Sequence, residues 1–458
     1  MILSDTEDPV HVPQSPQVIW VERLLWVFIM SFALDYRASD ARADSGGAGL
    51  DQLLFLSLAA FSTLGILYLG WRHLLVRPGA WFIAGWGAFL AFMVSNALLQ
   101  GVDIGRSLRI VLPLGLCFAG IVNAHIAACM GLRPSRIVAP ILVAACTNVV
   151  WRIVQGFLFK GVTMETARVE VQSSANNWIA AFIGCGLLLR SRFHWTILLA
   201  TGVLFTGIMI TITRSLLLPI MASALASTFC FMLGTRWRAF RLGDAPRRLS
   251  PVILVTVFAV LAIGAVAIVQ PLLIERWNER LFHHSADRNT TADISWLTRE
   301  AEAVAIFEIL NKDPIHYLYG HGIGASYYWD PDYMPEIYLV YPEDMVLGED
   351  VWFAGHSVWT YALFSGGVVA FVAYVALFIG NMVLSLLAAR DNASHPGPDY
   401  WLAFLPFISV CCVLSQSITT NPFDERLASI FIGLMVGLPQ AFNIRASWIH
   451  SSHQPGHV

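Results

Sequence analysis

The chain has 458 residues, of which 57% are hydrophobic and only 13% are charged. Because a soluble domain carries about 25% charged residues, this composition excludes a set of soluble domains and indicates a protein that crosses a membrane several times. The formal net charge of -3 points to no particular partner. The seven cysteines lie in or beside apolar runs without metal or redox spacing, so we expect them to be apolar core residues.

Twelve apolar runs follow one another along the chain. A membrane span needs about 20 predominantly apolar residues, and in lipid every backbone amide must bond within its own segment, so each run is expected to be a helix. The runs lie near 17–34, 52–74, 80–98, 108–129, 137–157, 177–190, 194–212, 215–234, 250–273, 367–389, 400–419 and 427–444. Acidic residues precede the first run instead of the basic residues of a cleavable signal peptide, so we expect it to be retained.

The sequence therefore predicts an all-α polytopic membrane protein with about twelve transmembrane helices. Residues 1–274 form a bundle of nine helices, residues 275–366 form a large extracytoplasmic loop, and residues 367–458 contain the last three helices and a cytoplasmic tail. Inside the loop, residues 294–311 have the apolar spacing of an amphipathic helix, with Asp293 as its N-cap. The proline at position 314 ends this helix.

Basic residues in the short loops give the predicted orientation. The segment from Thr235 to Leu249 carries five arginines and one aspartate, which is the strongest positive-inside signal in the chain. Counting spans from this segment places both termini in the cytoplasm and residues 275–367 on the outer face. Between Glu275 and Asp350, fifteen acidic residues face four arginines and one lysine. That balance excludes nucleic acid as a partner and makes the few arginines conspicuous.

Arg214 and Arg299 are the first candidates for chemistry. Arg214 stands between two apolar runs at the predicted outer interface, either as a snorkelling anchor or as a guanidinium that grips a phosphate. Arg299 lies in the second turn of the predicted loop helix, either as an exposed charge paired with a nearby glutamate or as a second phosphate ligand. Arg276 and Arg280 follow the ninth span, where they either anchor its end or bind substrate.

His356 is the third candidate and lies just before the tenth span. A histidine there either fills the interface or takes a proton from a hydroxyl at neutral pH, because its reference pKa is near 6.5. The turn containing Gly322 and Gly324 either has a structural role or lets a ligand approach the backbone. Tyr327 and Tyr328 offer flat faces for sugar rings.

The metal motifs of the loop are weak. Asp330-Pro331-Asp332 resembles the Asp-x-Asp of metal-dependent sugar transferases, but its proline equally marks a turn. The pair His283-His284 has no third ligand at a useful spacing. We therefore expect neither a metal nor another cofactor.

The order of these residues resembles the superfamily of O-antigen ligases and O-antigen and exopolysaccharide polymerases of bacterial inner membranes. The resemblance covers roughly Asn177 to Phe371. It rests on Arg214 at an outer helix junction, a large outer loop with Arg299 on a helix, a proline followed by Gly-x-Gly-x-Gly, and His356-Ser357 ahead of a later glycine.

The resemblance implies a helical fold like that of membrane glycosyltransferases and a metal-independent, inverting transfer. The donor would be a glycan on a polyprenyl diphosphate, and the acceptor would be another glycan or the lipid A–core of lipopolysaccharide. Arg214 and Arg299 would bind the diphosphate, and His356 would orient or deprotonate the acceptor hydroxyl. Membrane lipid would be the other partner.

Two alternatives remain open. Ligase and polymerase differ only in their acceptor, and the sequence does not separate them. From a different class, a chain with about twelve spans could be a flippase for lipid-linked glycans or another secondary transporter. Transporters place charges near the bilayer midplane and have internal repeats, whereas the charges in this chain lie at predicted outer interfaces.

Overall fold

The computed structural model is built almost entirely of helices. It describes residues 15–36, 50–163, 167, 171–190, 194–212, 214–241, 243, 245–282, 294–328, 333, 352, 354–394, 396–418 and 420–452. Within these ranges the only β pairing is an isolated antiparallel bridge between Tyr327 and Trp352. The all-helical membrane architecture predicted from composition is confirmed at this level.

All twelve apolar runs form helices. In chain order the α-helices are α1 (Pro16–Met30), α2 (Leu50–Gly70), α3 (Gly79–Leu99), α4 (Ile104–Cys129), α5 (Pro134–Val154), α7 (Ala175–Leu188), α8 (Trp195–Thr211), α9 (Leu217–Arg236), α10 (Ala245–Val269), α11 (Pro271–Phe282), α12 (Ile294–Lys312), α13 (His316–Tyr319), α15 (Val358–Asp391), α16 (Leu405–Gln416) and α17 (Arg426–Ser452). Among the described residues, eight helices are long and apolar enough to cross a membrane. The runs of α1, α7, α8 and α16 form shorter helices.

The centre of the bundle is the pair α4 and α17. A Cβ on Gly433 would lie 2.0 Å from the carbonyl oxygen of Cys117, and a Cβ on Gly120 would lie 2.7 Å from that of Ile430. Small residues let helix backbones approach closely, which is how helices associate in lipid, where the hydrophobic effect contributes little. Helices α1, α2, α3, α5, α15 and α16 pack against one or both members of this pair.

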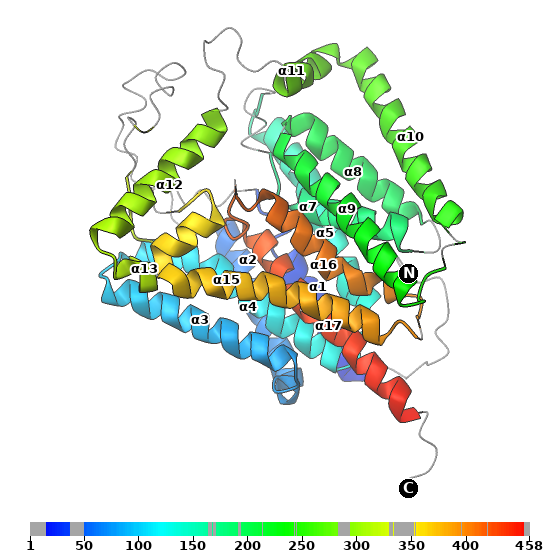
Figure 1. Ribbon diagram of the computed structural model, residues 1–458, viewed down its shortest axis with the longest axis horizontal. Helices are drawn as coiled ribbons and strands as arrows, with labels where there is room; N and C mark the ends of the chain where they lie inside the picture. The colour runs from blue at the N-terminus through cyan, green and yellow to red at the C-terminus, as the bar shows by residue number, and fades with distance from the viewer. Residues whose placement is uncertain are drawn as a thin grey trace.

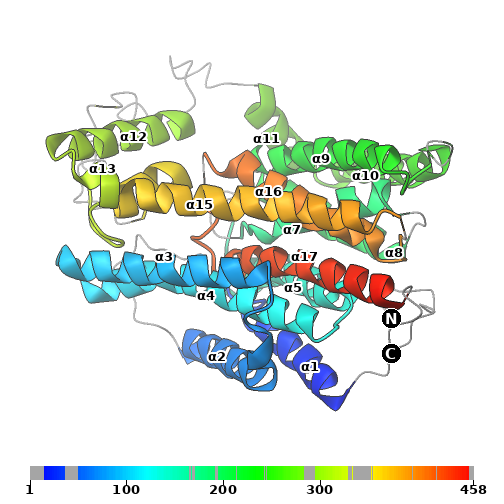
Figure 2. The same ribbon diagram turned by 60° about the horizontal axis from the view of Figure 1, so that its bottom comes forward.

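The two ends of the bundle differ. Helices α12 and α13 lie at one end, whereas α1 begins and α17 ends at the opposite end (Figure 2). Helices α10 and α11 lie to one side, beyond α8 and α9 (Figure 1). No residue from Leu249 to Val269 in α10 is buried, so this helix is attached to the bundle by few contacts.

The borders of the predicted loop fall inside helices. Helix α15 begins at Val358, nine residues before the predicted span at 367, and it bends at Gly367 (φ 63°, ψ −156°). A Cβ at Gly367 would lie 2.4 Å from the backbone of Leu318, so the bend brings α15 against α13. At its other border, residue 275 lies within α11. Helix α12 spans Ile294–Lys312, against the predicted 294–311, and the predicted N-cap Asp293 lies outside the described residues.

Candidate functional site

A buried carboxylate holds His356 at the end of the bundle. His356 lies immediately before Ser357, whose hydroxyl caps the N-terminus of α15 by accepting a hydrogen bond from the Trp359 amide. Its Nδ1 lies 2.6 Å from Oε2 of Glu302, and its backbone amide donates to Oε1 of the same carboxylate at 3.0 Å. Glu302 belongs to α12 and is 2% exposed. Two segments that are 54 residues apart therefore meet through hydrogen bonds to one carboxylate.

The hydrogen bonds of Glu302 determine the tautomer of His356. Burial alone raises the pKa of the Glu302 carboxyl, but the hydrogen bonds and electrostatic attraction of His356, together with the Tyr327 hydrogen bond, outweigh burial, so its pKa lies below the ordinary 4.5. An ionised carboxylate only accepts hydrogen bonds, so Nδ1 of the imidazole must carry a proton. The neutral ring then has its lone pair on Nε2, where it can accept a proton from a hydroxyl.

Arg299 lies on the same helix as Glu302, one turn earlier. Residues three apart on a helix are neighbours on its surface, with Cβ atoms about 5–6 Å apart. Arg299 is half-buried and lies on α12 one turn before the carboxylate that orients His356.

Arg214 reaches the same end of the bundle through α16. Helix α8 ends with Ile212 in a left-handed conformation (φ 47°), and Arg214 begins the 3-10 turn η3 (Arg214–Leu216) before α9. The side chain of Gln416 donates a 2.7 Å hydrogen bond to the carbonyl oxygen of Ser215. The next residue, Ser417, accepts a 2.9 Å hydrogen bond from the Trp359 indole, three residues after His356. The end of α16 thus connects the Arg214 junction with the His356 segment.

Gly322 and Gly324, which the sequence offered either as a structural turn or as a ligand-binding turn, pack closely against other parts of the protein. Gly322 and Gly324 have φ angles of 90° and 86°. A Cβ on Gly322 would lie 2.9 Å from the Val102 side chain, and one on Gly324 would lie 2.8 Å from the Ser107 amide nitrogen. Both positions need glycine because the turn packs directly against the α3–α4 connection. In this contact the two glycines have a structural role.

Tyr327 also differs from its predicted role. It is 3% exposed, its hydroxyl donates to Glu302 at 2.6 Å, and its ring meets the edge of Phe364 at 5.0 Å between centroids. Its ring is therefore part of the support for Glu302 and offers no free face to a sugar. Tyr328, by contrast, is 49% exposed.

Arg276 and Arg280 lie on α11. The neighbouring Trp277 is buried and donates a 3.2 Å hydrogen bond from its indole to the carbonyl oxygen of Met209, which fixes α11 against α8. Arg276 is half-buried, whereas the side chain of Arg280 lies outside the described residues. Asp330, Asp332 and the pair His283-His284 also lie outside them.

An apolar cavity of about 580 Å³ lies beside the Arg214 junction. Its walls come from α7, α8, α9, α10 and α11, and they include Leu217, Met209, Ala259 and Trp277. Leu217 is three residues after Arg214, so the cavity begins one helical turn from this arginine. A cavity with such walls suits a hydrocarbon chain.

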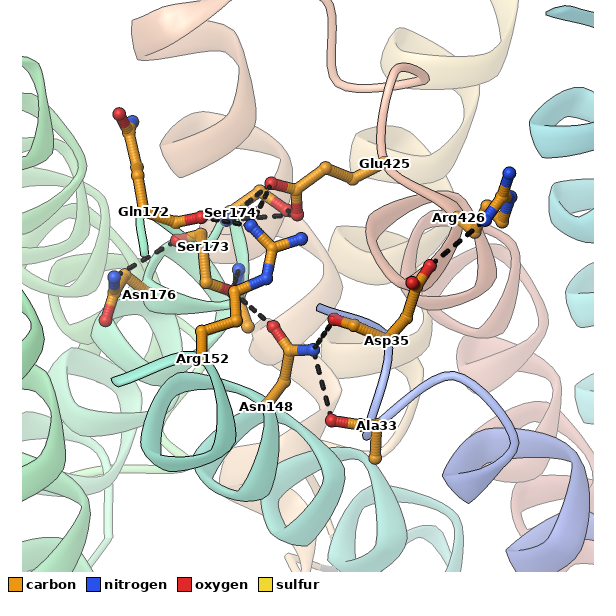
Figure 3. Close-up of polar contacts among 11 residues, drawn as sticks. Ala33, Asp35, Asn148, Arg152, Gln172, Ser173, Ser174, Asn176, Glu425 and Arg426 are labelled. Atoms are coloured by element: carbon orange, nitrogen blue, oxygen red, sulfur yellow. Dashed lines mark hydrogen bonds and ion pairs between the residues drawn. The ribbon is translucent and has the colours of Figure 1, made fainter. Parts of the chain in front are cut away.

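A second group of buried charges was not predicted from the sequence (Figure 3). Arg152 is 3% exposed and pairs with Glu425 at 3.3 Å, while Arg426 pairs with Asp35 at 3.2 Å. Asn148 lies between the two pairs: its amide donates to the backbone oxygen of Asp35 at 3.2 Å, and its Oδ1 accepts from the Ser173 hydroxyl at 2.6 Å. The signal was present, since Arg152 stands inside an apolar run, where an ionisable residue is a functional candidate.

Comparison of the sequence with protein-family models and with curated proteins gives no match. Within the described part of the chain, no three His, Cys, Asp or Glu side chains gather as a metal site.

Proposed function

We propose that this protein transfers a glycan from a polyprenyl diphosphate to an acceptor hydroxyl at the outer face of a bacterial inner membrane. The observation that carries this proposal is the Glu302–His356 pair at the end of the bundle that also holds Arg299 and Arg214. A carboxylate that orients an imidazole is a general-base arrangement, and guanidinium groups bind diphosphate oxygens.

The chemistry follows from these roles. The acceptor oxygen attacks the anomeric carbon while its proton passes to Nε2 of His356. The bond between the anomeric carbon and the diphosphate oxygen breaks, and the diphosphate leaves with the electron pair. Arg214 and Arg299 stabilise the charge that develops on this leaving group, a contribution worth about 10²–10³ in rate for one such donor. The apolar cavity beside Arg214 takes the lipid chain.

The same proposal includes orientation and span number. Arg236 and Arg390, at the ends of α9 and α15, lie at the opposite end of their helices from Arg214 and His356. The positive-inside rule then assigns that end to the cytoplasm. With the four shorter helices counted as spans, the chain has about twelve crossings, and both termini are cytoplasmic.

The test is substitution followed by analysis of glycans in cells. Arg214→Ala and His356→Ala should each abolish glycan transfer while protein amount in the membrane stays normal. Arg390→Ala is the matched control, because this arginine is exposed at the other end of the bundle, and it should leave transfer unchanged. Normal glycan length and amount in either site variant would contradict the proposal.

A second experiment separates transfer from transport and identifies the acceptor. Purified protein in liposomes with lipid-linked glycan and an acceptor should form product without a partner protein, whereas translocation without product would favour a flippase. In a deletion strain, loss of a ligase leaves bare lipopolysaccharide core. Loss of an O-antigen polymerase leaves a core with one repeat, and loss of an exopolysaccharide polymerase leaves the core pattern unchanged.

A further inference from the structure

A second cavity, with polar walls, lies between the α3–α4 connection and the glycine turn. Its volume is about 360 Å³. Polar groups from both segments line it, and Ile309 and Phe364 add apolar surface. The polar lining residues are Gln100, Asp103, Arg106, His321 and Ser326. His356, Glu302 and Arg214 do not line it, so this cavity is separate from the proposed transfer site.

The walls of this cavity are held on both sides. The amide of His321 donates to the carbonyl oxygen of Phe364 at 2.7 Å, which ties the glycine turn to α15. On the opposite side, the Ser107 hydroxyl donates to the carbonyl oxygen of Ile323 at 2.8 Å, which ties the same turn to α4. The cavity is therefore preformed and does not depend on a ligand to assemble it.

The charges of the lining residues indicate an uncharged ligand. Arg106 and Asp103 carry opposite charges and lie on one turn of α4, where the Arg106 amide donates to the Asp103 carboxylate at 2.8 Å. Burial and the neighbouring His316 lower the pKa of His321 below its ordinary 6.5, so this imidazole is neutral at pH 7. A carboxylate, a guanidinium, an amide and a hydroxyl together donate to and accept from hydroxyl groups.

The cavity is also connected to the catalytic pair by packed rings. Phe364 lies against Tyr327, and the Tyr327 hydroxyl donates to Glu302, which holds His356. Along α12, Ile309 is seven residues from Glu302, a rise of about 10 Å. A glycan at His356 is thus within a short distance of the polar cavity.

We propose that this polar cavity binds one uncharged sugar unit of the glycan, away from the unit that reacts. This inference rests on the proposed function, because it assigns the cavity to the same substrate. It predicts selectivity for hydroxyl-rich neutral rings over anions, since Arg106 and Asp103 bring one positive and one negative charge to the lining.

The test measures sugar binding by the full-length protein in detergent, without any transfer step. Glucose, galactose and N-acetylglucosamine are the neutral probes, and glucuronate and inorganic phosphate are the charged probes, each followed by saturation-transfer NMR. At least one neutral probe should bind. Ser326→Trp, at an exposed position on the rim, should weaken that binding at least about tenfold by filling the cavity, as should Asp103→Asn by removing an acceptor.

Leu99→Trp is the matched control and should bind like the unchanged protein, because it adds the same ring at an exposed residue next to Gln100 that does not line the cavity. Binding should also survive His356→Ala, which lies outside the cavity. Absence of binding by all neutral probes, preference for a charged probe, equal binding by Ser326→Trp and Leu99→Trp, or loss of binding in His356→Ala would each overturn the inference. Sugar binding at the cavity in a protein that forms no glycan product would overturn the proposed function alone.

Discussion

The Glu302 carboxylate accepts hydrogen bonds from two segments outside its own helix. Oε1 accepts from the Tyr327 hydroxyl and from the His356 amide, and Oε2 lies against the imidazole. Such a fully bonded buried carboxylate keeps its charge at neutral pH and holds the ring in one orientation. Under the proposed function Glu302 is a positioning residue, because it would act on substrate only through His356.

Replacing this carboxylate by its amide tests that role. Glu302→Gln keeps the shape of the side chain, but its neutral amide oxygen is a weaker hydrogen-bond acceptor for the Nδ1–H of His356. Transfer should therefore fall about 10²-fold or more. The effect should appear in kcat, while KM for the donor changes little. Glu300→Gln, two residues earlier on the exposed side of α12, is the control and should keep full activity. Equal rates in the two variants would remove Glu302 from the mechanism.

The lowered pKa of Glu302 also has a consequence for stability. A carboxyl whose pKa is lower in the folded state contributes stability that is present above its unfolded value near 4.5 and lost as pH falls through the folded value. Glu302→Gln should therefore lose less stability than the unchanged protein when pH falls below 4.5. Thermal unfolding in detergent between pH 7 and pH 3.5 measures this difference, and parallel curves would contradict it.

At the scale of single residues, the sequence indicated which side chains have suitable chemistry better than it predicted the residues that they contact. His356 and Arg299 stand out in the sequence because imidazole and guanidinium groups suit the proposed chemistry. Glu302 lies three residues after Arg299 and could have been found from that spacing. Gln416, by contrast, carries no local signal, because its bond to the Ser215 carbonyl depends on how α16 packs against α9.

Among the elements, the beginning of α17 is tied to three others by buried charges. Arg426 pairs with Asp35 after α1, while Glu425 pairs with Arg152 of α5 and accepts from the Ser174 amide before α7 at 3.2 Å. Removing one partner of a buried pair leaves an uncompensated charge, which is more costly than losing the attraction itself.

Arg152→Ala should therefore destabilise the protein by about 3–5 kcal/mol. The double variant Arg152→Ala with Glu425→Ala should lose less than the sum of the two single variants. Arg136→Ala is the control. Arg136 lies on α5, like Arg152, and its exposed pair with Glu22 of α1 should be worth no more than about 1 kcal/mol. Chemical unfolding in detergent provides the measurement, and additive single effects would show that the pair is uncoupled.

Helix positions followed from composition because lipid leaves a backbone no other way to satisfy its amides. The start and bend of α15 did not follow, because the predicted loop extends to residue 366 whereas the helix already begins at Val358. At Gly367 the backbone of α13 comes so close that a Cβ would lie 2.4 Å from it. The two segments are about 50 residues apart, so no local sequence pattern predicts this contact.

For the whole molecule, the apolar cavity and the Arg214 junction are adjacent features. If the cavity takes a lipid chain, filling it should weaken donor binding without touching the polar site. Ala259→Trp, on the α10 wall, should raise the KM for a long-chain donor at least about tenfold and leave kcat near its normal value.

Val260→Trp is the control for this substitution. It adds the same ring to the next residue of α10, which does not line the cavity and is 62% exposed. This variant should behave like the unchanged protein. Equal KM values for the two tryptophan variants would show that the cavity does not bind the donor.

Helix α10 forms one wall of that cavity, yet none of its residues from Leu249 to Val269 is buried. Moving this helix outward therefore breaks few contacts with the rest of the protein. Under the proposed function, the spent carrier lipid left after each transfer would need only this displacement to return sideways to the bilayer. We expect carrier recycling to proceed without opening the α12–α13 end of the bundle, so a crosslink that holds α12 against α15 should leave it unaffected.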